Sequence, residues 1–145
     1  MDPDIQRDFP DLTDDNHTET SPEDFEYNCL AFVLGDLRNW WEPPGLFGHY
    51  WPDGFSADVT VDTAVSILKL HGYIDEVAIG TTPDVEAVAV YAEGSEWTHF
   101  AKFSHNMWFS KLGGGKDISH ERLESLEGYF GKVVRVLAKQ VREPQ

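Results

Sequence analysis

Hydrophobic residues recur at helical spacing in two segments of the first half of the chain. Residues 28–37 carry them three or four positions apart, as Leu30, Val33, Leu34 and Leu37. Residues 60–71 show the same period. Thr60 is suited to begin a helix, and Gly72, which follows the segment, is a residue type that commonly ends helices. The pattern predicts one helix in each segment.

The second half of the chain alternates between apolar and polar residues, which is the period of a half-buried strand. It predicts strands over residues 73–78, 85–92, 97–103, 107–112 and 132–138, and a short helix over 119–126. Tight turns join neighbouring strands at 94–95 and 105–106. We therefore expect an α+β fold with N-terminal helices packed on one face of a five-stranded, mainly antiparallel sheet.

The two tight turns also predict which residues lie opposite one another. They give four cross-strand pairs: Ala92–Trp97, Val90–His99, Phe103–Trp108 and Ala101–Ser110. On this register His99 faces the core and Ser110 lies diagonally across from it. We expect the helix around Cys29 to cover that face.

Length and composition place the chain among small folded domains. It has 145 residues, 41% of them hydrophobic, and no apolar run approaches the roughly 18 residues that cross a bilayer. The first residues lack the basic and apolar regions of a secretory signal. Cys29 is the only cysteine, so no internal disulfide can form. We expect a cytoplasmic monomer without a membrane segment.

The net charge of −15 is concentrated at the beginning of the chain. Residues 1–26 contain ten acids and one base, whereas residues 27–145 contain sixteen acids and ten bases. Such dense like charge predicts a solvated, poorly ordered arm over residues 1–20, followed by one domain over 21–145. Because no basic patch is present to neutralise phosphates, nucleic acid is excluded as a partner.

Cys29 and His99 are the residues on which a chemical function would depend. A thiol at the start of a helix and an imidazole on a packed strand are the minimum equipment of a cysteine hydrolase. Ser110, or alternatively Asn106, would orient the imidazole. Both principal residues also have ordinary interpretations, since a free cysteine is usually packing and a core histidine usually bonds a backbone carbonyl.

Other residues are candidates for binding a substrate. Asn28 precedes the cysteine and could contribute to an oxyanion hole beside the helix start. A loop rich in proline and glycine carries the aromatic residues Trp40, Trp41, Tyr50 and Trp51. This aromatic loop either forms a lip beside a substrate cleft or covers an edge of the core. The six histidines show no ligand spacing typical of zinc, so no metal and no cofactor is expected.

Several short motifs resemble known proteins when they are taken together. They are Tyr27-Asn28-Cys29, Val88–Gly94, Thr98-His99-Phe100-Ala101 and Trp108–Gly113. The order of cysteine helix, histidine strand and polar residue resembles the papain-like superfamily, in particular its NlpC-type and CHAP-type amidases and peptidases. The Val88–Gly94 segment resembles a strand of those families. The other three motifs, together with Trp40-Trp41, Tyr50-Trp51-Pro52 and Leu126-Glu127-Gly128, are similar over residues 25–138 to a bacterial family of uncharacterised proteins. Asn28 departs from the aspartate usual before the NlpC-type cysteine, and His99 follows a tight hairpin rather than a glycine-rich loop.

The resemblance implies a papain-like fold and chemistry at an amide bond through an acyl-thioester. We accordingly predict a cysteine hydrolase, an amidase, peptidase or acyltransferase, that acts on a peptide or glycopeptide through Cys29 and His99. The alternative is a non-catalytic binding or immunity-like protein that has the same fold and presents an acidic surface to a basic protein partner.

Overall fold

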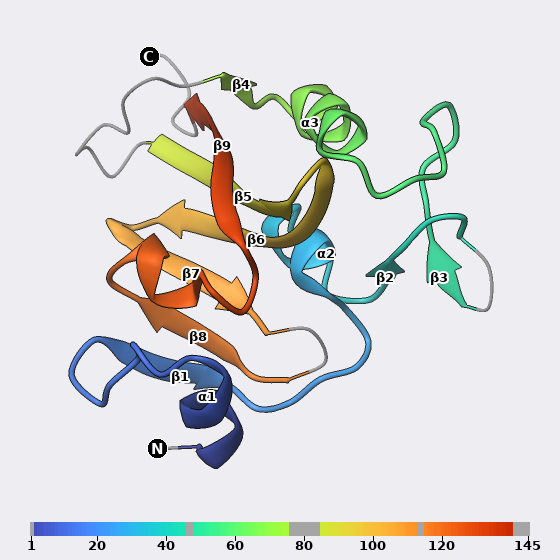
Figure 1. Ribbon diagram of the computed structural model, residues 1–145. Coiled ribbons are helices and arrows are strands. Elements are labelled where there is room, and N and C mark those ends of the chain that lie inside the picture. Colours follow the sequence, from blue (N-terminus) through green and yellow to red (C-terminus); the bar gives the residue numbers. More distant parts are fainter. Residues whose placement is uncertain (1, 46–47, 76–84, 113–114, 141–145) are drawn as a thin grey trace.

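A seven-stranded antiparallel sheet dominates the computed structural model, which describes residues 2–45, 48–75, 85–112 and 115–140 (Figure 1). The strands follow the order β1-β8-β7-β6-β5-β9-β4 across the sheet. Their bounds are β1 His17–Ser21, β4 Ile74–Asp75, β5 Val85–Glu93, β6 Glu96–Ser104, β7 Met107–Lys111, β8 Asp117–His120 and β9 Lys132–Gln140. A separate parallel pair joins β2, Trp40–Trp41, to β3, His49–Tyr50.

Four short helices accompany the sheet in the described residues. They are α1 Pro3–Asp8, α2 Cys29–Val33, α3 Val61–Leu70 and the 3₁₀-helix η1 Leu123–Leu126. Thr60 caps α3 by accepting a hydrogen bond from the backbone of Thr63, as its position in the sequence predicts. The expected helix over 28–37 is shorter, because Gly35 adopts a φ of +80° and ends it.

The expected fold class is wrong. The described chain is mostly β, and its sheet has seven strands rather than five. The sequence pattern misses β1, which lies in the acidic segment, and β8, where a short helix was expected. The expected strand over 73–78 is reduced to β4, and residues 76–78 lie outside the described residues.

Helices cover both faces of the sheet rather than one. We call the core on the side of α2 and α3 the first core; it contains Val88, Val90 and Phe100 from the sheet. The second core lies on the opposite face and is completed by residues around α1 and η1; it includes Tyr91, Ala101 and other residues of β5 to β8. The sheet is therefore a central layer between two apolar cores.

A β-bulge changes the face to which His99 points. In the pairing of β5 with β6, Ala92 lies opposite Trp97 as expected, but Tyr91 rather than Val90 lies opposite His99. One extra residue in β6, Thr98, accounts for this shift. In a regular strand Trp97 and His99 would share a face, because side chains alternate along it. The extra residue places them on opposite faces: Trp97 packs on the first core, and His99 contacts rings of the second.

The acidic arm is packed on the sheet, which corrects the expectation of a poorly ordered segment. β1 pairs with β8 and so forms one edge of the sheet, while α1 lies beside it (Figure 1). Ile5, Phe9 and Leu12 are buried in the second core. The apolar residues in this segment are few, but they are spaced so that all three meet the sheet, while the acids face solvent or pair with bases.

No helix among the described residues is long and apolar enough to cross a membrane.

Candidate functional site

His99 lies at the bulge of β6 and is completely buried. Its ring stacks on Phe130, with centroids 4.1 Å apart and planes 5° from parallel. Tyr91 lies on another side of the ring, at a centroid distance of 5.2 Å. The backbone carbonyl of Phe130 accepts a hydrogen bond from the hydroxyl of Thr98, so the bulge residue helps to hold the stacked ring in place.

A chain of hydrogen bonds leads from His99 across two neighbouring strands. Nε2 of His99 lies 3.0 Å from Oγ of Ser110, and Oγ of Ser110 lies 2.7 Å from Nε2 of His120. Nδ1 of His120 lies 3.1 Å from the backbone oxygen of Arg122. The three side chains come from β6, β7 and β8, which are adjacent in the sheet (Figure 1), and all three are buried.

Burial keeps both imidazoles uncharged at neutral pH. It lowers the pKa of His99 well below its usual range, and the neighbouring His120 acts in the same direction. Burial also lowers the pKa of His120 to about 4, although the bond to the Arg122 carbonyl opposes that shift. Each ring therefore carries one proton, and each has one nitrogen that can donate and one that can accept.

Cys29 occupies the first position of α2 and is 6% exposed. Burial raises the pKa of its thiol to about 11, while the backbone N–H groups of Phe100, Leu30 and Cys29 itself, together with the charge of Lys111, oppose the rise. The amide of Phe100 is available because the ladder between β6 and β7 ends at the pair Ala101–Ser110. The thiol is thus neutral at rest and has backbone N–H groups beside it.

The structure brings His99 to Ser110 but does not hydrogen-bond Cys29 to His99. Nδ1 of His99 is buried and has no hydrogen-bond partner among the described residues. Cys29 belongs to the first core with Phe100, the residue next to His99, whereas the ring of His99 contacts the second core. The helix around Cys29 therefore covers the opposite face from the one expected. The bulge in β6 is the physical reason.

Ser110, rather than Asn106, holds the imidazole of His99. Asn106 lies in the turn between β6 and β7, where it adopts a φ of +65°. Asn28 acts as the cap of α2: its Oδ1 accepts from the backbone of Ala31 at 3.2 Å, and its Nδ2 donates to the Trp41 carbonyl at 2.7 Å. The side chain of Asn28 thus ties the start of the cysteine helix to β2.

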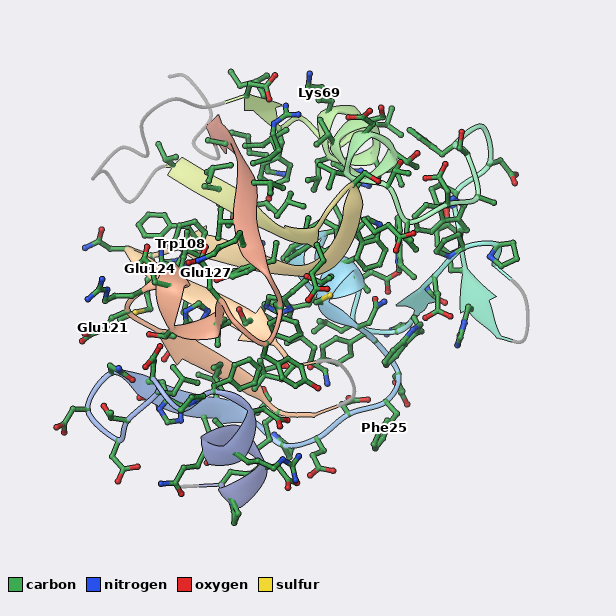
Figure 2. All side chains as sticks on the ribbon, in the orientation of Figure 1. Phe25, Lys69, Trp108, Glu121, Glu124 and Glu127 are labelled. Atoms are coloured by element: carbon green, nitrogen blue, oxygen red, sulfur yellow. The ribbon has the colours of Figure 1, made fainter. Side chains whose placement is uncertain are left out.

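The aromatic loop is divided between packing and exposure. Trp41 is buried and Trp51 packs against the first core, whereas Tyr50 remains 42% exposed and meets Trp41 edge-on. Trp40 lines a shallow hollow with Phe25 and His49. The ring of Phe25 projects away from the ribbon (Figure 2). The packing interpretation therefore holds for Trp41 and Trp51, whereas the role of the loop as a lip beside a cleft stays a prediction.

The chain was compared with known protein families, curated proteins and solved structures. A family described as a domain of unknown function, DUF7689, matches residues 18–138. This chain belongs to the DUF7689 family. The match runs from β1 into β9, so it includes the cysteine and the three residues of the hydrogen-bonded chain but not α1. The other two comparisons gave no match.

His120 is a residue of the site of this DUF7689 domain that the sequence pattern does not predict. His120 lies in β8, and a segment that was expected to begin a helix gave no reason to place its ring in the core. A signal was nevertheless present, because Ile118 and His120 are two residues apart and thus share a face of any strand. The described residues hold no group of three or more side chains suited to bind a metal ion.

A second polar group of this DUF7689 domain lies near Cys29. The hydroxyl of Tyr27 donates to Oδ2 of Asp117 at 2.8 Å, and the ammonium of Lys111 lies 5.1 Å from the centre of the Tyr27 ring. Lys111 is fully buried and donates to the carbonyl of Gly115. Burial lowers the pKa of Lys111, and the Asp117 carboxylate opposes that shift. A buried cation therefore lies on the side of the sheet that carries the thiol.

Proposed function

We propose that this protein is a cysteine hydrolase or acyltransferase that acts on an amide bond of a peptide or glycopeptide. Cys29 is the nucleophile, His99 is the general base, and Ser110 orients the imidazole. One observation carries the proposal: Ser110 holds His99 through Nε2, while Nδ1 is buried without a partner among the described residues. A buried imidazole with one anchored and one unused nitrogen is arranged to accept a proton.

The resting thiol and imidazole are both neutral, so catalysis begins with a proton transfer. Nδ1 of His99 takes the proton of Cys29 as the sulfur attacks the substrate carbonyl carbon and forms a carbon–sulfur bond. Backbone N–H groups near the sulfur stabilise the resulting oxyanion. The imidazolium then returns its proton to the departing amine, and water, or an acceptor amine, releases the acyl group from sulfur.

The proposal places two requirements on the molecule. The sulfur has to reach Nδ1, to which it is not hydrogen-bonded at rest, and the substrate carbonyl has to reach a thiol that is 6% exposed. Displacing α2, a helix of five residues whose entry is fixed by Asn28, would expose the thiol to a substrate. Because Cys29 and His99 lie on opposite faces of the sheet, contact between the sulfur and Nδ1 also requires β6 to shift locally at the bulge around Thr98.

Thiol alkylation tests this function without a known substrate. Because the thiol is buried and neutral at rest, we expect native wild-type protein to react slowly with iodoacetamide at pH 7, and His99→Ala to react about tenfold more slowly still. His105→Ala is the matched control, because His105 is exposed in a turn. Cys29→Ser supplies the unlabelled baseline. A thiol that reacts at the same rate in wild type and His99→Ala, both folded, would refute the role of His99.

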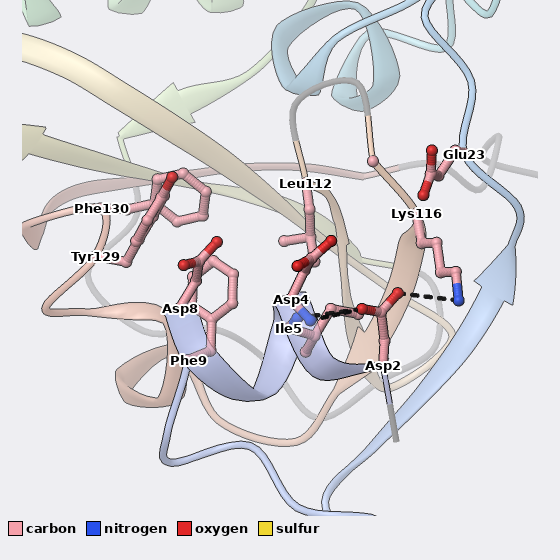
Figure 3. A pocket seen from close by; sticks show the side chains of 11 residues that line it. Asp2, Asp4, Ile5, Asp8, Phe9, Glu23, Leu112, Lys116, Tyr129 and Phe130 are labelled. Carbon is pink, nitrogen blue, oxygen red and sulfur yellow. Dashed lines mark hydrogen bonds and ion pairs between the residues drawn. The ribbon is translucent and has the colours of Figure 1, made fainter.

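A second candidate function is supported by a pocket beside α1. The pocket has a volume of about 200 Å³, and its apolar side is formed by Phe9, Tyr129 and Phe130. Carboxylates of Asp2, Asp4, Asp8 and Glu23 also line it. Figure 3 shows the carboxylate of Asp8 beside the three rings. Aromatic faces and carboxylates together favour a cationic group.

The second candidate function is therefore that of a non-catalytic binding protein. Its pocket would take up a lysine or arginine side chain of a basic protein partner. Among the residues that the structure describes, Lys116 is the single base that lines the pocket, and it is already paired with Asp2 at 3.1 Å. Asp8 is paired with Arg7 at 2.9 Å on the exposed surface, so an incoming cation would compete with Arg7 for this carboxylate. Titration calorimetry with a hexa-arginine peptide tests the idea. We expect Asp8→Asn to weaken binding at least threefold, and Asp53→Asn, an exposed acid elsewhere, to leave it unchanged. Equal affinity in the two variants would contradict binding at the pocket.

A further inference from the structure

We infer that His120 is a positioning residue that determines which nitrogen of His99 carries the proton. The inference rests on the proposed function, in which His99 needs an unprotonated Nδ1. It starts from the three contacts that link the side chains of β6, β7 and β8 and end at the Arg122 carbonyl. A hydrogen bond has a direction, and a chain of them can be followed from its fixed end.

The fixed end is the backbone carbonyl of Arg122, which can only accept. Nδ1 of His120, 3.1 Å away, must therefore carry a hydrogen and donate it. His120 is buried and neutral, so its other nitrogen, Nε2, is a lone pair. That lone pair lies 2.7 Å from Oγ of Ser110, and so the hydroxyl of Ser110 must donate to His120.

The direction of the Ser110 hydroxyl then decides the state of His99. Because the Ser110 proton is used by His120, Oγ is left as an acceptor toward Nε2 of His99 at 3.0 Å. Nε2 of His99 must carry the proton, and Nδ1 of the neutral ring is a lone pair. This is the tautomer in which Nδ1 can accept a proton from a thiol, while the donated Nε2–H keeps the ring oriented.

If every hydrogen bond of this chain pointed the other way, the bond between His120 and the Arg122 carbonyl would be lost. If His99 accepted from Ser110, Ser110 would have to accept from Nε2–H of His120. The lone pair of Nδ1 would then face the lone pairs of the Arg122 carbonyl, and a buried hydrogen bond would be lost. A loss of that kind corresponds to a preference of about tenfold for the inferred direction.

Nitrogen NMR reads the tautomer directly. In ¹⁵N-labelled wild-type protein at pH 7, long-range proton–nitrogen correlations should show His99 protonated at Nε2 in about 90% of molecules. His120→Phe keeps the ring shape but offers no acceptor, so Ser110 becomes free to donate to His99. We expect a several-fold increase in the Nδ1-protonated form in this variant.

His17→Phe is the matched control, since His17 lies opposite His120 on β1 but outside the hydrogen-bonded chain. It should leave the tautomer of His99 unchanged. Wild-type protein with His99 protonated at Nδ1 would overturn the inference, and this result needs no variant to fold. A similar shift in both variants would also overturn it.

The two proposals can fail separately. If His99 shows the inferred tautomer but alkylation of Cys29 does not depend on His99, the inferred role of His120 stands and the hydrolase does not. If alkylation depends on His99 and the tautomer is unaffected by His120→Phe, the reverse holds. Alkylation of His120→Phe at pH 7 should be slowed severalfold, toward the rate of His99→Ala.

Discussion

Replacing Phe9 by alanine tests whether the acidic arm is part of the folded domain. Phe9 is 4% exposed, and its ring lies 5.0 Å from that of Tyr129 and 5.3 Å from that of Phe130. A buried aromatic side chain covers about 150–250 Å². At about 25 cal/mol per Å² this corresponds to roughly 4–6 kcal/mol as an upper bound. The compactness of unfolded chains and the methyl group that alanine retains reduce the expected loss to about 3 kcal/mol.

The assay is urea unfolding followed by tryptophan fluorescence, with thermal unfolding as a second measurement. A loss of about 3 kcal/mol corresponds to a decrease of roughly 9 °C in melting temperature for a chain of this size. Phe25→Ala is the matched control, because Phe25 is 75% exposed and should change stability by less than about 0.5 kcal/mol. If both variants unfold with the wild type, the arm does not unfold cooperatively with the sheet, and the packing argument is wrong.

Three further predictions concern the same two cores. The folded-state pKa of His120, about 4, lies below the unfolded value of about 6.5; the neutral ring therefore contributes stability above pH 6.5, and about 3 kcal/mol is lost as the pH falls to 4. The free energy of unfolding in urea should therefore fall less between pH 7 and pH 4 in His120→Gln than in the wild type. An equal fall in both proteins would show that the His120 ring does not cause it. Gly131→Ala should cost at least about 2 kcal/mol more than Gly54→Ala, since both glycines have a positive φ but a methyl group at Gly131 would collide with a carbonyl of β5. Equal thermal stability of these two variants would exclude the collision. Tyr27→Phe should destabilise by about 1–3 kcal/mol, because it removes the hydroxyl donor of buried Asp117; a value near zero in chemical unfolding would show that another donor takes its place.

The hairpins of the sheet could be predicted from turn chemistry. The turn at 105–106 gives the pairs Phe103–Trp108 and Ala101–Ser110, both of which the structure confirms. His105 and Asn106 adopt the positive φ angles that a tight two-residue turn requires. The contact of Ser110 with His99 follows from this part of the register. Its diagonal geometry across two strands was therefore accessible from the sequence.

The face of the sheet to which His99 points could not be predicted, because a bulge does not alter the alternation of apolar and polar residues in a recognisable way. Thr98 is a good strand residue, and nothing in its type indicates that it is the extra one. The packing of the arm was hidden for a different reason: its acids outnumber its apolar residues, although Ile5, Phe9 and Leu12 are sufficient to cover an exposed part of the sheet. Average charge describes the solvated side of such a segment and not the side that packs.

The pairing of β1 with β8 has a consequence for how the domain folds. It joins a strand near the beginning of the chain to one near its end, whereas β5, β6, β7 and β8 are connected by short links. Local pairings close with little entropic loss, but this one has to wait until β8 is in place. The arm should then add to the edge of a sheet that has already formed. Until it does, β8 presents an unpaired strand, and at high protein concentration the arm of a second molecule can occupy that edge and give a strand-exchanged dimer.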